Sequence, residues 1–178
     1  MSGSQWCARF PESRSLDDLL PDFARRVRAF LAQLAHAGAV VSIADTWRAP
    51  ERAYLMHWCC MIAKGGQDPD AVPPMTGVDI DWVCGGDRAR ARAAAAAMMK
   101  GYGIVFPAAL ASRHTQRRAV DMTIRWRGAL DLRDAEGRAQ AVTGTPRNGT
   151  HPGLVAVGAS FGVMKLLSDP PHWSDDGH

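Results

Sequence analysis

Two stretches organise this sequence: SRHTQRRAVD at residues 112–121 and DPPHW at residues 169–173. His114 is predicted to lie in a loop, and Asp121 follows it near the start of a strand. These two side chains can therefore converge on one ion without an intervening helix. His172 stands between a proline, which restricts the backbone, and a tryptophan. Three protein ligands with an open fourth position are typical of a catalytic zinc site. From the residues alone, a metal centre and a pair of structural histidines both remain open.

The rest of the chain is predicted to be a scaffold of alternating helices and short strands. Hydrophobic residues at helical spacing, caps and glycine stops mark the helices, and period-two alternation marks the strands. Helices are expected at 17–37, 51–64, 88–99 and 152–161, strands at 39–44 and 119–126, and a hairpin around 134–137. We expect one domain, residues 1–178, with an extended lead-in over 1–14. The fold class is α+β, with a small, mainly antiparallel sheet and packed helices.

Composition limits the class of protein. A chain of 178 residues with 47% hydrophobic content can bury its own core. Cys59 and Cys60 are adjacent and no C-x-x-C pair occurs, so the four cysteines are expected to be reduced, mostly buried thiols. The N-terminal residues have no apolar signal region, and no run is long enough to span a membrane. We therefore expect a chain that is cytoplasmic as synthesised, not inserted in a membrane, and monomeric.

The positive charge leaves the partner open. A formal net charge of +3 would suit an anionic polymer, either a cell wall or a nucleic acid. Arg88, Arg90 and Arg92 follow each other at every second position of a predicted helix, so they do not form one tight face. Together with Arg117 and Arg118 they are better explained as solvated surface than as a nucleic-acid site.

The motifs resemble those of a known family. Ser112-x-His114, with Ala119 and Asp121 after it, is similar to the Ser-x-His-x-x-Gly-x-Ala-x-Asp motif of the D-alanyl-D-alanine carboxypeptidase family of zinc peptidases. DPPHW resembles that family's second motif, in its L-alanyl-D-glutamate endopeptidase branch, which includes phage endolysins. The sequence DTWR at residues 45–48 is similar to its arginine motif at the end of a strand.

The resemblance implies a fold like that of the hedgehog and D,D-peptidase domains, and it implies roles for the matched residues. His114, Asp121 and His172 would bind Zn²⁺. Asp169 would be the general base, and Arg48 would hold the substrate or stabilise the oxyanion of the tetrahedral intermediate. Ser112 is expected to shape the loop rather than to take part in the reaction.

Two positions depart from the motifs. Arg117 stands where the family has glycine, which matters if the loop needs a positive φ or a close approach. Ala53 stands near the place of a glutamine that often follows the arginine. Both departures bear on substrate choice more than on metal binding.

The expected function is zinc-dependent hydrolysis of an amide bond in the peptidoglycan stem peptide. The resemblance favours an endopeptidase, acting at L-Ala-D-Glu or a nearby bond, over a D,D-carboxypeptidase. The partner would be peptidoglycan or a muropeptide. The enzyme would act on the wall after release, as in phage lysis, or recycle wall fragments in the cytosol. The alternative from another class is a non-catalytic wall-binding module that retains the fold.

Overall fold

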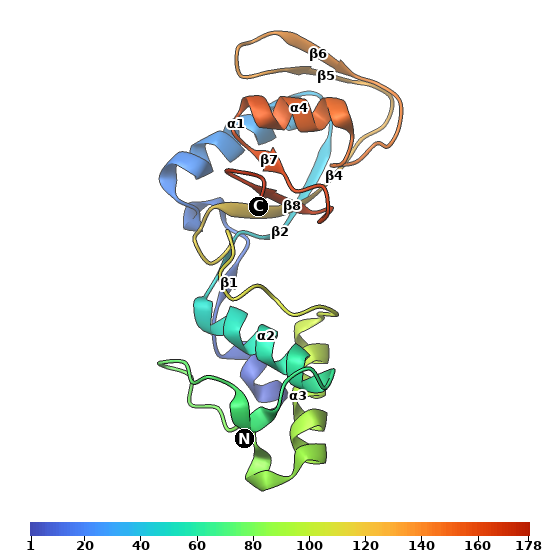
Figure 1. Cartoon of the computed structure of the whole chain (residues 1–178). Helices are drawn as coiled ribbons and strands as arrows, with labels where there is room; N and C mark the ends of the chain where they lie inside the picture. Colours follow the sequence, from blue (N-terminus) through green and yellow to red (C-terminus); the bar gives the residue numbers. More distant parts are fainter. The chain divides into compact units, whose positions relative to one another are not determined.

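The computed structural model describes all 178 residues and has the predicted α+β architecture (Figure 1). The helices are α1 (Pro21–His36), α2 (Pro50–Ala63), α3 (Arg88–Tyr102) and α4 (Pro152–Ser160). The strands are β1 (Glu12–Ser13), β2 (Val40–Asp45), β3 (Trp47–Arg48), β4 (Ala119–Arg125), β5 (Leu130–Arg133), β6 (Ala139–Val142), β7 (Met164–Lys165) and β8 (His172–Ser174). The chain forms two compact units, one of Met1–Glu12 with Arg48–Ala111 and one of Ser13–Trp47 with Ser112–His178.

The second unit is built on a four-stranded antiparallel sheet with the order β2-β4-β8-β7. Figure 1 shows α1 and α4 on the same side of this sheet. The hairpin β5–β6 was predicted, and its strands pair from Leu130↔Val142 to Arg133↔Ala139. Because both helices pack on one side, the sheet has one buried face and one that these helices leave uncovered.

Strand β4 alternates as the sequence predicts. Val120, Met122 and Ile124 are each at most 1% exposed and join the core beneath α1 and α4. The intervening positions, which begin with Asp121, point to the opposite face, because successive side chains of a strand alternate. The alternation therefore decides that Asp121 lies outside the hydrophobic core.

Trp173 anchors β8 in that core. Its side chain is fully buried, and its ring centroid lies 5.5 Å from that of Phe30 on α1. Gly158 lets α4 pass close by, because a Cβ at this position would lie 2.7 Å from the Trp173 ring and 3.0 Å from the carbonyl oxygen of Val163. The residue next to His172 is thus fixed by packing.

Two details differ from the sequence prediction. The first long helix begins at Pro21 rather than near residue 17, because Ser15 caps a separate 3₁₀ turn, Leu16–Asp18, through its side-chain bond to the Asp17 N–H. Strand β2 is an edge strand and is not wholly buried: Val40 is 71% exposed. The short apolar, β-branched run at residues 39–44 predicts a buried strand, whereas the helices cover only one face of the sheet.

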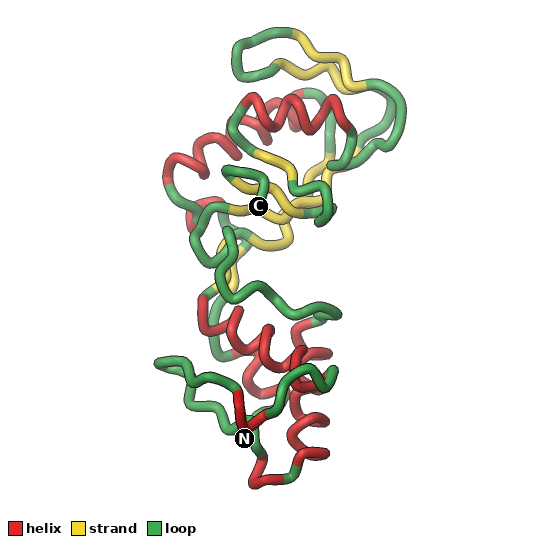
Figure 2. The backbone as a smooth tube through the Cα atoms, viewed as in Figure 1, coloured by secondary structure: helices red, strands yellow, loops and turns green.

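The first unit is mainly helical, and the strands drawn yellow in Figure 2 are concentrated in the second unit. Helices α2 and α3 share a core with Trp6. Residues 1–14 are not wholly extended, because they include a 3₁₀ helix, Ser4–Ala8. Cys59 and Cys60 are buried free thiols, as expected. No helix of the structure has the length and apolar character needed to cross a membrane.

Candidate metal centre

Three elements of the second unit deliver the side chains of the candidate site. His114 comes from the loop before β4, Asp121 lies on β4, and His172 is the first residue of β8. Asp121 and His172 are direct partners in the antiparallel β4–β8 register. Side chains directly opposite each other on neighbouring strands have Cβ atoms about 4.5–5.5 Å apart, so the register brings these two groups together.

The ligand atoms form a nearly equilateral triangle. The Nε2 atom of His114, the Nδ1 atom of His172 and the Oδ1 atom of Asp121 lie 3.1 Å from one another. Both imidazoles are buried, whereas the Asp121 side chain is 18% exposed. The cluster is therefore closed on the imidazole side and reachable by solvent beside the carboxylate.

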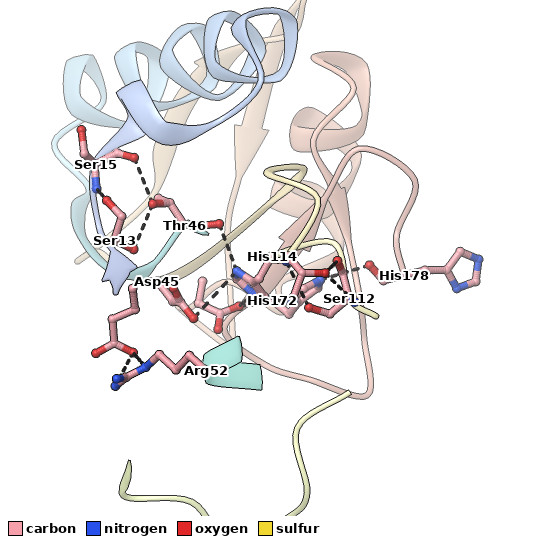
Figure 3. Close-up of polar contacts among 12 residues, drawn as sticks. Ser13, Ser15, Asp45, Thr46, Arg52, Ser112, His114, His172 and His178 are labelled. Atoms are coloured by element: carbon pink, nitrogen blue, oxygen red, sulfur yellow. Dashed lines mark hydrogen bonds and ion pairs between the residues drawn. The ribbon is translucent and has the colours of Figure 1, made fainter. Parts of the chain in front are cut away.

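The outer nitrogen of each imidazole faces a main-chain oxygen (Figure 3). The Nδ1 atom of His114 lies 3.2 Å from the oxygen of Thr46, and the Nε2 atom of His172 lies 3.1 Å from the main-chain oxygen of His178. A main-chain oxygen only accepts, so each of these outer nitrogens carries the proton and donates it. The imidazole of His178 itself points away from the cluster (Figure 3).

This proton assignment leaves three acceptors facing one another. With the outer nitrogens protonated, the neutral rings of His114 and His172 turn lone pairs towards each other and towards the Asp121 carboxylate. An extra proton on one ring can satisfy only part of this set, whereas one cation satisfies all three atoms. Outer hydrogen bonds that fix the tautomer of a ligating histidine are a regular feature of metal sites.

The distances fit a divalent metal without identifying it. Tetrahedral zinc with bonds of about 2.0–2.1 Å holds its ligand atoms about 3.3–3.4 Å apart. Octahedral coordination with bonds of the same length holds neighbouring atoms about 2.8–3.0 Å apart. The observed 3.1 Å lies between these values. The group His114–Asp121–His172 could hold a metal ion, and its geometry alone does not show that the ion is zinc.

The carboxylate of Asp121 is held in its ionised form. Burial by itself would raise the pKa of Asp121, but when the imidazoles are protonated, the hydrogen bonds and positive charge of His114 and His172 together outweigh burial and move this pKa well below its usual range. An ionised carboxylate is the form that binds a metal, so this ligand needs no deprotonation near neutral pH.

The loop before β4 is shaped by its own side chains. The hydroxyl of Ser112 accepts the N–H of Thr115 at 3.3 Å, and the hydroxyl of Thr115 donates to the Ser112 carbonyl at 2.8 Å. Ser112 therefore shapes the loop, as the sequence predicts.

Arg117 adopts a left-handed backbone with φ of 62°, and its guanidinium lies 4.8 Å from the Trp47 ring centroid. Arginine therefore holds a positive φ at the position where the motif that this loop resembles has glycine.

Two arginines tie this loop to the segment after β8. Arg113 binds the carboxylate of Asp176 through two nitrogens, and Arg118 pairs with Asp175 at 2.5 Å.

The hydroxyl of Ser174 accepts the N–H groups of Gly177 and His178. These contacts hold the turn that presents the His178 oxygen to His172, so they reach the metal ligands through one intermediary.

A buried lysine binds the main chain of the segment that leads into β8. The ammonium of Lys165 donates to the carbonyl oxygens of Leu166 and Asp169, each at 2.6 Å, and of His172 at 2.9 Å. Burial lowers its pKa, although the nearby carboxylates Asp169 and Asp121 partly oppose this effect. The three acceptors use all three ammonium protons, so Lys165 fixes the main chain that leads from Asp169 to His172.

The structure brings three of the five predicted site residues together. Asp169 lies on the turn before β8, its side chain is exposed, and its carboxylate makes no hydrogen bond with the three ligands. Arg48 ends β3 and belongs to the first unit. The catalytic roles of Asp169 and Arg48 stay predictions.

Searches of protein-family models, curated proteins and solved structures found no match to this chain. The site therefore rests on its own geometry and on the resemblance of its motifs.

Sequence reasoning missed the groups that support the ligands. The main-chain oxygens of Thr46 and His178 have no signature in a sequence, since every residue has one. Asp45 had a detectable signal, a carboxylate at the end of a predicted strand. It is buried, it is the β4 partner of Asp121, and its Oδ2 atom lies 3.9 Å from the Nδ1 atom of His114.

Proposed function

We propose that this chain is a zinc-dependent peptidase that hydrolyses an amide bond in the stem peptide of peptidoglycan. One observation carries the proposal. Three potential ligand atoms lie 3.1 Å apart, and both outer imidazole nitrogens face main-chain oxygens that fix the required tautomers. Two imidazoles and one carboxylate leave a coordination position for water or substrate, as catalytic zinc sites do.

Each residue has a distinct role in this proposal. His114, Asp121 and His172 hold the ion, and the exposed side of Asp121 gives the substrate access to it. Bound zinc would lower the pKa of a water molecule towards about 7. Asp169 takes the proton from the attacking water and gives it to the leaving amine. Arg48 holds the substrate or stabilises the negative oxygen that develops at the scissile carbonyl.

The resemblance favours an endopeptidase that cuts at L-Ala-D-Glu or a nearby bond, in cell-wall lysis or turnover. A D,D-carboxypeptidase is the alternative within the same chemistry. The two differ in their products: a carboxypeptidase removes one terminal residue, whereas an endopeptidase separates the peptide into larger fragments or releases it from the glycan.

A non-catalytic wall-binding module is the second candidate. The observation that speaks for it is the exposed Asp169 side chain, which makes no hydrogen bond with the three ligand residues. In that case the metal would support the fold of the second unit, and the protein would bind peptidoglycan without cutting it.

The deciding experiment is product analysis by mass spectrometry on purified peptidoglycan, with protein whose metal content has been measured. We expect the zinc-loaded protein to release peptide, a chelator to stop the release, and Asp169→Asn to retain zinc but lose activity. Asp22→Asn, which alters an exposed carboxylate on α1, is the matched control. Equal activity of Asp169→Asn and the parent protein would exclude the base role. Wall binding without peptide release by zinc-loaded parent protein would favour the non-catalytic module.

A further inference from the structure

The face of the sheet that α1 and α4 leave uncovered continues away from the metal centre. Along β4, Thr123 and Arg125 follow Asp121 on this face, and both are exposed. Ser42 and Val40 on β2 stand directly opposite them and are also exposed. The face therefore presents hydroxyl groups in the middle and one cation at the end farther from the metal ligands.

Two hollows flank this row of β4 side chains, and both are lined by Thr123 and Arg125. One has a volume of about 330 Å³ and is walled by residues 148–150 and by Pro170 and Pro171. It lies where β8 no longer covers the edge of β4, because β8 pairs only as far as Asp121. The other has a volume of about 310 Å³ and is bounded by Val40 and Ser42.

The first hollow borders the turn that leads into the candidate metal centre. Its wall residues Pro170 and Pro171 lie between Asp169 and His172, and the Pro171 carbonyl accepts the N–H of Met122 at 2.8 Å. A molecule in this hollow would therefore touch the same turn that delivers His172 to the cluster.

Arg125 gives the face its charge. It forms no ion pair, whereas Arg113, Arg118 and Arg138 each pair with an aspartate of the same unit. An exposed guanidinium without a carboxylate partner can bind a ligand carboxylate through two parallel hydrogen bonds.

The spacing suits an extended peptide. Residues of a strand rise about 3.3 Å each, so Arg125 lies about 13 Å along β4 from Asp121. A peptide extended along this face has the same rise, and a group four residues from the bond at the metal centre would reach Arg125. A nucleic acid fits less well, because the face offers one cation beside the Asp121 carboxylate and not a row of cations.

We infer that the exposed face of β4 is a substrate subsite for an extended peptide and that Arg125 recognises a carboxylate of that peptide about 13 Å from the scissile bond. This inference rests on the proposed peptidase function. It makes Arg125 a specificity residue, with Thr123 and Ser42 as hydrogen-bonding groups along the path.

The test uses synthetic stem peptides in which each carboxyl group in turn is free or amidated. For the zinc-loaded parent protein, amidating one carboxyl group should raise KM about tenfold or more, with little change in kcat, as expected for losing a charged hydrogen bond. Arg125→Ala should raise KM for the free-carboxyl peptide to the value of its amidated form, and Arg125→Lys should keep part of the discrimination. Arg127→Ala, at an exposed arginine outside both hollows, is the matched control and should behave as the parent.

The inference is overturned if the parent treats free and amidated peptides alike, or if Arg125→Ala raises KM equally for both. Calorimetric binding of the same peptides separates this outcome from failure of the proposed function. If the zinc-loaded parent cuts no peptide but binds the free-carboxyl form more tightly, and Arg125→Ala removes that preference, the peptidase proposal fails and the subsite stands. If binding shows no preference either, both fail.

Discussion

The left-handed residue in the first motif gives the sharpest test of the structure. Arg117 has a φ of 62°, a conformation that costs a non-glycine residue about 1–2 kcal/mol. Its guanidinium lies 4.8 Å from the Trp47 ring centroid, a contact that contributes about 0.5–1 kcal/mol at an exposed site. Replacing Arg117 by alanine and by glycine separates these two effects.

The two variants should differ in stability. Arg117→Ala loses the ring contact and keeps the backbone cost, so it should be less stable than the parent by about 0.5–1 kcal/mol. Arg117→Gly also loses the contact but gains about 1–2 kcal/mol from relief of the left-handed backbone, less about 0.5–1 kcal/mol for the greater freedom of the unfolded chain. Glycine should therefore come close to the parent and exceed alanine by about 0.5–1 kcal/mol.

Equilibrium urea unfolding measures the difference in stability between the two variants, because urea midpoints can be compared directly when the variants share the same m-value. A chelator is present so that bound metal does not contribute to the stability. The main-chain bonds of Arg117, to the His114 oxygen at 3.1 Å and from the Leu20 N–H at 2.9 Å, survive both substitutions. Metal affinity should therefore not change in either variant. A glycine variant as unstable as the alanine variant, or less stable, would refute a left-handed backbone at this position.

Four further outcomes are expected. Zn²⁺ at about 100 times its Kd should stabilise the protein by about 2.7 kcal/mol and raise Tm by about 5–11 °C. Asp121→Ala and His172→Ala should abolish this rise in Tm. His36→Ala, which changes an exposed histidine, should keep it. Asp176→Ala should weaken zinc binding in competition titrations by about tenfold or more, because it loosens the turn that presents the His178 oxygen to His172. The control variant Asp22→Ala should leave the affinity for zinc unchanged. The hydrogen bond from Arg113 lowers the pKa of Asp176 from 3.8 to about 2. The stabilisation from this bond should therefore be present above about pH 4 and be lost as the pH falls towards 2. Urea midpoints that drop equally in Asp176→Asn and the parent over this range would contradict this prediction. Gly158→Ala should lower the free energy of unfolding by about 1–3 kcal/mol, since its Cβ would meet the Trp173 ring at 2.7 Å, and an unchanged thermal midpoint would argue against this packing.

The alternation of strand β4 predicts both the strand and the separation of Asp121 from the face of Val120 and Met122, because a period of two is a local property of an extended chain. The same local reasoning misjudged β2, whose apolar composition does not reveal that it lies at the edge of the sheet. Burial depends on which elements pack on a strand, and this is decided by distant parts of the chain.

The α+β class and the residue types that could form a metal centre follow from the amino-acid sequence alone. His114, Asp121 and His172 were identifiable because few side chains bind metals and because their motifs have characteristic spacing. The tertiary structure sets the separation of 3.1 Å between the three ligand atoms, since this distance depends on the β4–β8 register and on the loop before β4. It also decided the tautomers, because the oxygens of Thr46 and His178 are 68 and 6 residues away from the histidines they orient, and main-chain oxygens carry no mark in a sequence.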